Sequence, residues 1–315
     1  MAVPHPNAAA IEWLQIEKAR LKQGLVAQNT VLGYGYDMRM YAAWCERYHR
    51  SALPTTAETL SLYLTDLLSH GKKITTARRR QCAVLHAHRS HGLEAPDVTE
   101  VRALLRGAQR LRAEKPRQMR PITVCELRKM SGCLLRIGSI AAMRNRALLV
   151  IGFASTLRRS NLALLNLSDV EFCRQGLVIH VEREKQDQEG RGRFIGIARG
   201  RYPNTDPVRV LKAWLRVRGT NPGPLFPRVT KFRRGERLDG ECICRIVKKC
   251  LAGIGIDPRQ SGAHSLRAGA ITAMGEANVS ALRISAYTAQ TPEIVRRYFR
   301  RADIWRNNAS VSLGL

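Results

Sequence analysis

The chain has 315 residues, of which 44% are hydrophobic, so it can bury the cores of two domains and is not a disordered protein. Lysine and arginine number 53 against 25 aspartates and glutamates, which leaves a formal net charge of +28. This excess favours binding to a polyanion through phosphate contacts. No apolar run reaches the about 18 residues that a membrane span needs.

The first half of the chain contains the patterns of several short helices and no pattern of a strand. Apolar residues recur at helical spacing over 8–28, 30–49, 55–70, 75–91 and 98–112. Thr55 and Glu58 have the spacing of a capping box at the start of the third of these helices. We therefore expect a compact helical domain over residues 1–115.

The start of the fourth helix is strongly basic and rich in hydroxyl groups. Thr75 is expected to cap this helix, and hydroxyls and arginines at a helix N-terminus form a good site for phosphate. We predict the main DNA contact of the first domain here, although a solvated charged face explains the same residues. The predicted contacts are Lys72, Lys73, Thr75, Thr76, Arg78, Arg79 and Arg80. Further along this helix, His86, His88 and His91 have no acidic or thiol partner nearby in the sequence, so packing is favoured and no metal is expected.

Residues 116–122 have the composition of a linker between two domains. Its prolines favour an extended chain, and the cationic Arg117 and Arg120 suit contacts with DNA phosphates. Thr123 and Glu126 have the spacing of a second capping box. This box opens the second domain, which we expect to span residues 123–315.

The second half of the chain combines helices with a small group of strands. An apolar helix ends near Thr156, and another helix begins at Arg159. The β-branched residues of 177–181 and 194–197 predict a hairpin, and Asp239 is placed to cap a later helix. The expected fold is therefore mainly α-helical, with a small antiparallel β-sheet in the C-terminal domain.

One helix start carries residues suited to phosphate chemistry. His264 and Arg267 lie three residues apart, so an imidazole and a guanidinium share one helix face and can contact the same phosphate. Tyr298 follows in a basic segment. A phenol has a reference pKa of about 10, but it can attack a phosphodiester that arginines hold while the leaving oxygen is protonated. The cluster points to DNA strand cleavage by tyrosine, although the His-x-x-Arg pair alone also fits an ordinary helix start.

Two further cations complete a recognisable order along the chain. Arg158 follows the apolar helix, and Lys185 lies between the two predicted strands. The order Arg158, Lys185, His264, Arg267 and Tyr298 resembles that of the tyrosine recombinase (phage integrase) family, well over roughly residues 120–315 and more loosely before them.

The resemblance implies a two-domain clamp on DNA and a role for each of these residues. Tyr298 is the expected nucleophile, and Arg158 and Arg267 are the expected phosphate ligands. Lys185 matches the general acid for the leaving 5′-oxygen, and His264 matches a phosphate contact or proton-transfer group. No metal, ATP or other cofactor is implied.

Three positions depart from the family pattern. Nine residues before Tyr298 the family has His or Trp, whereas Ala289 cannot donate to a phosphate oxygen; losing one such donor costs a factor of about 10²–10³ in rate. Asn161 replaces the usual acidic residue, and Thr156 replaces the usual glycine. The neighbouring candidate substitutes for the missing donor are Gln290, Thr288 and Thr291.

The resemblance predicts a site-specific recombinase that forms a 3′-phosphotyrosine on Tyr298. Its expected partner is double-stranded DNA with paired sites, bound by a homo-tetramer that is a monomer or dimer when free. One alternative is a DNA-binding architectural or regulatory protein of the same fold without turnover, which Ala289 and Asn161 favour. Another is a type IB topoisomerase, which shares the chemistry but relaxes DNA alone.

The cysteines bear on the compartment. Eight of them are scattered along the chain without a C-x-x-C pair, which indicates reduced thiols. We therefore expect a cytoplasmic protein. The family resemblance further implies a prokaryotic, nucleoid-associated protein that belongs to a mobile genetic element.

Overall fold

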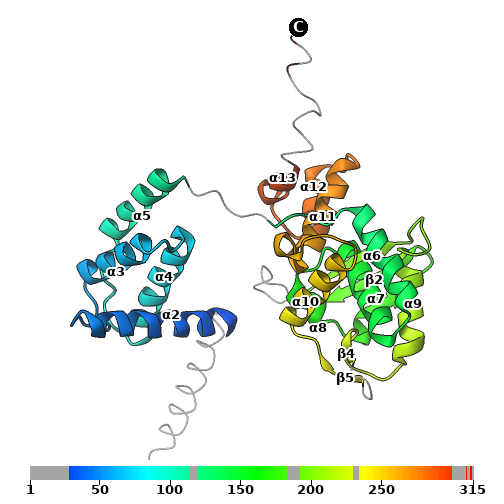
Figure 1. Ribbon diagram of the computed structural model, residues 1–315, viewed down its shortest axis with the longest axis horizontal. Coiled ribbons are helices and arrows are strands. Elements are labelled where there is room, and N and C mark those ends of the chain that lie inside the picture. Colours follow the sequence, from blue (N-terminus) through cyan, green and yellow to red (C-terminus); the bar gives the residue numbers. More distant parts are fainter. Residues whose placement is uncertain are drawn as a thin grey trace, which may run out of the picture. The chain divides into compact units, whose positions relative to one another are not determined.

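The computed structural model describes residues 28–113, 119–182, 192–229 and 234–299, together with Ser310 and Leu313. The chain divides into two compact units, Met1–Pro116 and Arg117–Leu315, whose elements are labelled in Figure 1. The helix expected over 8–28 lies outside the described residues except for its last position. None of the helices in the described ranges combines the length and the apolar character needed to span a membrane.

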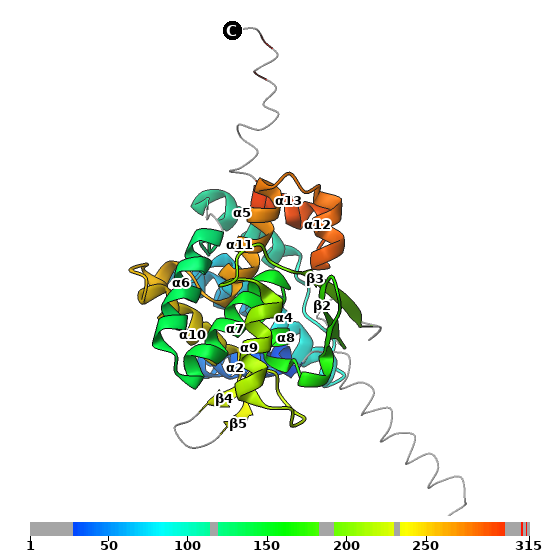
Figure 2. The ribbon, with the colours of Figure 1, turned by 90° about the vertical axis from the view of Figure 1, so that its right-hand side faces the viewer.

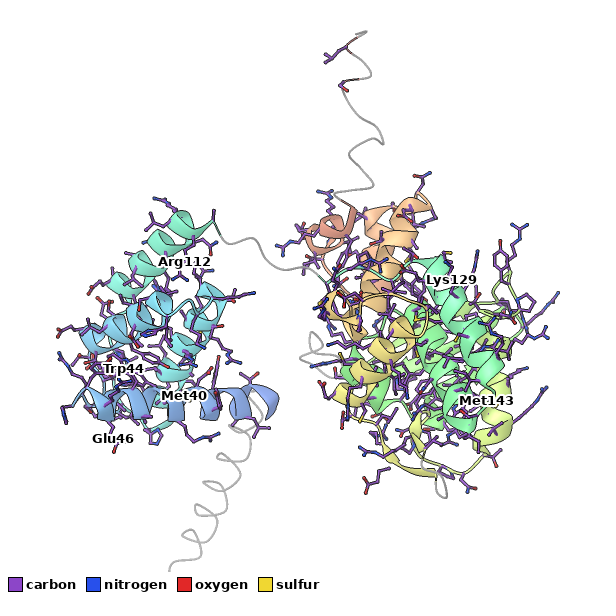
Figure 3. All side chains as sticks on the ribbon, viewed as in Figure 1. Met40, Trp44, Glu46, Arg112, Lys129 and Met143 are labelled. Atoms are coloured by element: carbon purple, nitrogen blue, oxygen red, sulfur yellow. The ribbon has the colours of Figure 1, made fainter. Side chains whose placement is uncertain are left out.

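The described part of the first unit is entirely helical. Its elements are α2 (Gln28–Arg47), α3 (Ala57–Ser69), α4 (Ile74–Ser90) and α5 (Thr99–Arg112). Tyr41 and Tyr63 are buried in the core with ring centroids 4.8 Å apart. Trp44 donates from Nε1 to Oδ2 of Asp66 at 3.0 Å, and Figure 3 shows it on the side of α2 that faces the other helices, opposite Glu46. Tyr41 and Trp44 of α2 therefore stabilise the unit from within.

The start of α3 lies one residue later than its expected capping box. Oγ1 of Thr56, not of Thr55, accepts the backbone N–H of Thr59 at 3.1 Å. Oγ1 of Thr55 instead shares a hydrogen bond of 2.5 Å with the buried hydroxyl of Tyr41. Because that hydroxyl is used in the core, the next threonine caps the helix.

The start of α4 also differs from the prediction. Lys73 occupies the N-cap position without a side-chain cap, and Thr75 lies inside the first turn. Further along α4, His88 is buried; its Nε2 accepts the N–H of Thr55 at 3.0 Å, and its Nδ1 lies 2.9 Å from the carbonyl of Val84. This histidine therefore has the packing role that the sequence favoured.

The second unit combines helices with two small antiparallel sheets. Its helices are α6 (Val124–Ile137), α7 (Ile140–Ala154), α8 (Arg159–Leu164), η1 (Leu167–Asp169), α9 (Pro207–Arg218), α10 (Gly240–Ala252), η2 (Pro258–Gln260), α11 (Ala263–Glu276), α12 (Ala281–Thr288) and α13 (Pro292–Phe299). Its strands are β1 (Val170–Phe172), β2 (Gly176–Val181), β3 (Arg193–Ala198), β4 (Pro227–Val229) and β5 (Arg234–Arg237). The sheet orders are β1-β2-β3 and β4-β5.

The predicted hairpin is the pair β2 and β3, which runs from Gly176 opposite Ala198 to Val181 opposite Arg193. The mainly helical fold with a small antiparallel sheet in the second unit is therefore confirmed.

Helix α7 forms the centre of the second unit. It packs against both α6 and α9, and the three helices lie side by side in Figures 1 and 2. Its buried residues surround the helix, which explains the long apolar run at its C-terminal half. The capping box of Thr123 and Glu126 forms at the start of α6, and Oδ1 of Asp239 caps α10 by accepting the N–H of Cys242 at 2.6 Å, as predicted.

The second half of the predicted linker packs on α11. Arg120 donates its backbone N–H to the carbonyl of Gln260 at 2.9 Å, and Ile122 donates to that of Ser265 at 3.0 Å. The carbonyl of Ile122 lies so close to Gly269 that any Cβ there would overlap it. Residues 119–122 are thus fixed beside the first turns of α11, which carries His264 and Arg267.

Candidate active site

Tyr298 and His264 meet at one end of the second unit. Figures 1 and 2 show α11, α12 and α13 grouped there. Tyr298 on α13 packs against the small apolar cluster of Ile271, Ile284 and Val295. Its hydroxyl lies 3.2 Å from Nε2 of His264, although 34 residues separate them in the chain. The structure thus brings together the predicted nucleophile and the predicted histidine.

The surroundings of His264 favour the neutral form of its imidazole. Part of the ring is exposed to solvent, but the surrounding protein removes enough water to lower its pKa below the ordinary value. The positive charges of Arg267 and Arg158 lower this pKa further. With its proton on Nδ1, a neutral imidazole can accept the proton of a phenol at Nε2.

Arg267 connects two segments that border the site. The residue is only 1% exposed. Nη1 donates to the carbonyl of Thr156 at 2.6 Å, and Nη2 donates to the carbonyl of Thr288 at 2.7 Å. The buried cation therefore joins the turn before Arg158 to the end of α12.

Both of these segments contain a non-glycine residue in the left-handed region. Thr156 has φ +54° and is fully buried, and Ala289, the C-cap of α12, has φ +48°. Oγ1 of Thr156 is buried without a hydrogen-bond partner among the described residues. A positive φ disfavours β-branched residues, which accounts for the glycine that the family pattern has at the position of Thr156.

Arg158 lies at the N-cap of α8 in extended backbone conformation, with φ −66° and ψ 149°. It is partly exposed, and its charge is close enough to lower the pKa of His264. Asn161, on the same short helix, is buried, and its Oδ1 accepts a hydrogen bond from Oγ of Ser160 at 3.1 Å. Arg158, His264, Arg267 and Tyr298 therefore converge on one site.

Of the candidate donors near Ala289, Gln290 is best placed to be available. The hydroxyl of Thr288 donates to the carbonyl of Ile284 at 2.8 Å, and the hydroxyl of Thr291 bonds to the carboxylate of Glu293. Oε1 of Gln290 is buried and has no hydrogen-bond partner within the described ranges. The donor of this amide is Nε2, so Gln290 is the remaining candidate because the hydroxyls of Thr288 and Thr291 are engaged locally.

Arg193 and Tyr287 support the site and were not predicted from the sequence. Arg193 begins β3 and donates from Nη1 to the carbonyl of Tyr287 at 2.8 Å. The hydroxyl of Tyr287 donates to the carbonyl of Ala154 at 2.8 Å, and burial raises its pKa to about 12. Tyr287 therefore connects α12 to the end of α7 and is not a nucleophile. Only the charge of Arg193 and its place at a strand start could have drawn attention to it.

Two predicted site residues, Lys185 and Arg117, lie outside the described residues. Arg120 is described, and its guanidinium forms an ion pair with the carboxylate of Glu126, with Nη1 3.2 Å from Oε2.

The predicted DNA contacts of α4 divide between the surface and the core. Lys72, Lys73, Thr75, Arg78 and Arg79 are exposed, and Thr76 is half-buried. Arg79 also forms an ion pair of 2.9 Å with buried Asp37. Arg80 is only 7% exposed, donates to the hydroxyl of Tyr63, and has Nε 3.7 Å from Oδ1 of Asp37. Arg80 lies on the inner face of α4 and is therefore a core residue, not a phosphate contact.

The comparisons with known proteins agree with this arrangement. The model of the Phage integrase family matches residues 124–303. A curated relative from Selenomonas ruminantium, described as an integrase/recombinase xerD homolog, is 30% identical over 306 residues, which cover 95% of this chain and 89% of the relative.

Solved structures share the fold. A lambda integrase dimer bound to a COC′ core site has a TM-score of 0.60 at 17% identity, with 91% of this chain and 94% of that chain covered. The Tn1549 transposon integrase in complex with a circular intermediate DNA has a TM-score of 0.62 at 15% identity, with 90% and 92% covered. The chain therefore belongs to the phage integrase family of tyrosine recombinases, a class of enzymes that transfer DNA strands.

Proposed function

We propose that this protein is a site-specific DNA recombinase that cleaves and rejoins strands through a 3′-phosphotyrosine on Tyr298. The observation that carries the proposal is the 3.2 Å distance between the hydroxyl of Tyr298 and Nε2 of His264. This pair lies beside Arg158 and Arg267, whose charges reach the imidazole.

This geometry supports the following cleavage step. The hydroxyl oxygen of Tyr298 attacks the scissile phosphorus, and its proton passes to Nε2 of His264, which the lowered pKa keeps neutral. The bond from phosphorus to the 5′-oxygen breaks, and Lys185 protonates the leaving oxygen, a role that rests on the family resemblance. Rejoining reverses the step with a 5′-hydroxyl as nucleophile. One phosphoester bond is exchanged for another, so no ATP is consumed.

The two arginines contribute differently to the charged transition state. Arg158 is partly exposed, so it binds the non-bridging phosphate oxygens directly. Arg267 is buried and holds the carbonyls of Thr156 and Thr288. It adds positive charge from behind the phosphate while it keeps both segments in place.

Gln290 is the proposed replacement for the donor that Ala289 lacks. The assignment is supported by the local hydrogen bonds of Thr288 and Thr291, which leave the amide N–H of Gln290 as the neighbouring candidate donor. Gln290→Ala should lower the cleavage rate by about tenfold or more, since a transition-state donor is lost. An unchanged rate would exclude the assignment. Ala289→His should raise the rate, because it restores the family donor.

DNA binding and assembly complete the proposal. The exposed cations at the start of α4 and just before it are proposed phosphate contacts, namely Lys72, Lys73, Arg78 and Arg79. They belong to a proposed DNA-binding half over residues 1–115, which 116–122 joins to a catalytic half over 123–315. Four protomers are proposed to act on two paired sites. All eight cysteines are free thiols, which supports action in a reducing compartment, and we propose the prokaryotic cytoplasm.

The test uses a nicked duplex that traps the covalent intermediate. Its site is first selected from a random DNA pool by binding to the protein. Wild type should form a covalent protein–DNA adduct, and Tyr298→Phe should form none while it binds the same DNA. Tight binding without adduct at any pH between about 6 and 9 would favour an architectural protein. Relaxation of supercoiled DNA without recombinant product would favour a topoisomerase.

A further inference from the structure

Arg237 at the end of β5 contacts the C-terminal end of α8. This helix has only six residues and follows directly on Arg158, its N-cap. The last carbonyls of any helix lack a partner inside the helix, and a helix this short is not stable by itself. The groups that bind its C-terminal end therefore help to fix the orientation of α8.

One guanidinium supplies most of these groups, and the backbone N–H of Leu225 also bonds the carbonyl of Leu165 at 2.8 Å. Nη1 of Arg237 lies within hydrogen-bonding distance of three consecutive carbonyls: those of Ala163 at 2.9 Å, Leu164 at 2.6 Å and Leu165 at 3.3 Å. Nη2 donates to Oδ1 of Asn166 at 2.6 Å. Both terminal nitrogens are thus directed at the end of α8, and the cation lies where a helix terminus favours positive charge.

The remaining contacts of α8 act on its buried inner face and on the side chain of Arg159 at its start. Asn161 and Leu162 are buried in the unit, and Gly240 at the start of α10 lies close to the side chain of Arg159. At about 1.5 Å per residue, six residues extend only about 9 Å. A displacement of the C-terminal end therefore moves Arg158, the N-cap residue, by a similar distance. A misplacement of about 1 Å in a catalytic group can lower the rate by about 10²-fold.

We propose that Arg237 is a positioning residue for Arg158: it fixes the C-terminal end of α8 and thereby the approach of the Arg158 guanidinium to the scissile phosphate. The inference rests on the proposed function and extends it to a residue that does not touch the DNA. A direct phosphate contact is disfavoured because four acceptors already surround the two terminal nitrogens.

The experiment measures the single-turnover rate of adduct formation at saturating nicked duplex, together with the Kd for the same DNA, in the full-length chain. Arg237→Met should lower the rate by about 10–100-fold with a Kd within about twofold of wild type. Arg237→Lys should recover part of the rate, because an ammonium can bond the carbonyls but lacks the second arm that reaches Asn166. If Arg237→Met folds poorly, the adduct rate of Arg237→Lys still tests the proposal.

The matched control is Arg146→Met on α7. Arg146 also binds within the second unit, from Nε to Oγ of Ser131 at 2.9 Å and from Nη2 to the carbonyl of Asn204 at 3.0 Å. These contacts do not involve α8, so this variant should lose similar bonds and keep the wild-type rate. An equal rate loss in Arg146→Met would assign the effect of Arg237 to general stability and overturn the proposal.

A double-mutant cycle with Arg158→Lys tests the route of the effect. If Arg237 acts through Arg158, then Arg237→Met should lower the rate of the Arg158→Lys variant by less than about twofold. If the rate losses of the two single variants multiply in the double variant, the positioning role is refuted. A loss of DNA affinity without a loss of rate in Arg237→Met would refute it as well. A wild type that forms no adduct overturns the proposed function itself. A wild-type rate in Arg237→Met overturns only this inference.

Discussion

Nη1 of Arg267 donates to the carbonyl oxygen of Thr156 at 2.6 Å, across 111 residues of the chain. Thr156 is a β-branched residue in the left-handed region, with φ +54°. Such a conformation persists only where the surrounding structure holds it, and costs about 1–3 kcal/mol. The buried guanidinium is one of the groups that hold it, and the strain lies two residues before Arg158.

Thr156→Gly should therefore increase the free energy of unfolding by about 1 kcal/mol. Glycine adopts this φ without strain, and the change removes a buried hydroxyl that has no partner among the described residues. Part of the gain is offset by the greater freedom of glycine in the unfolded chain, about 0.4–1 kcal/mol. Urea unfolding measures the difference. Thr156→Ala, which removes the hydroxyl and keeps the strained φ, should stabilise less, and a destabilised glycine variant would show that the threonine methyl group dominates.

The lowered pKa of His264 predicts the pH dependence of cleavage. The neutral imidazole accepts the proton of Tyr298, so the single-turnover rate should persist as the pH falls through 6.5, the ordinary histidine value, and decline only below it. His264→Gln should cleave slowly and lack this decline. A decline centred above pH 6.5 would contradict the lowered pKa of His264.

The same shift has a consequence for stability. Below pH 6.5 the unfolded chain binds a proton at His264 more readily than the folded chain does, so this group makes the folded state less stable as the pH falls. Wild type should thus lose more stability between pH 7 and pH 5 than His264→Gln does. Parallel urea titrations of the two proteins at both pH values measure this difference. The contributions of the other histidines are the same in both proteins and cancel.

Each protomer should use its own nucleophile. Tyr298 packs against Ile271 and Ile284 and lies beside His264 of the same chain. A mixture of Tyr298→Phe with Arg158→Lys should therefore form no more adduct than Arg158→Lys alone. Restored adduct in the mixture would indicate that a tyrosine is donated between protomers. A mixture of wild type with Tyr298→Phe controls for assembly of the mixed complex.

Two glycines in helices should respond to alanine in opposite directions. A Cβ at Gly269 of α11 would overlap the carbonyl of Ile122, whereas one at Gly132 of α6 meets no atom within 4 Å. Gly269→Ala should lower the free energy of unfolding by about 1–3 kcal/mol, because the backbone must shift. Gly132→Ala should raise it by about 0.5–1 kcal/mol through helix propensity. Thermal or urea unfolding of the pair separates the contact from the general effect of the substitution.

Periodic and local patterns explain what the sequence could predict. The capping box at Thr123 and the hairpin of β2 and β3 follow from side chains that interact with near neighbours, so spacing reveals them. The His-x-x-Arg spacing likewise placed His264 and Arg267 on the first turns of one helix. The family order of these groups then indicated that Tyr298 belongs to the same site, and its hydroxyl lies 3.2 Å from Nε2 of His264.

The failures concern side chains whose partners are distant in the chain. Thr55 was expected to cap α3, but the hydroxyl of Tyr41 occupies it. Arg80 belongs to a run of similar cations, and only the positions of Tyr63 and Asp37 show that it points inward. Arg237 has no local motif, because its acceptors lie more than seventy residues earlier.

The close packing of residues 119–122 on α11 also defines where a chimeric recombinase can be joined. Arg120 and Ile122 bond to the backbone of Gln260 and Ser265, so this stretch is an integral part of the second unit. Exchanging the first unit for that of a relative should therefore preserve Met119 onward as native sequence. A junction placed after Ile122 would give α11 a foreign backbone against Gly269, and its fit there would decide whether the hybrid folds.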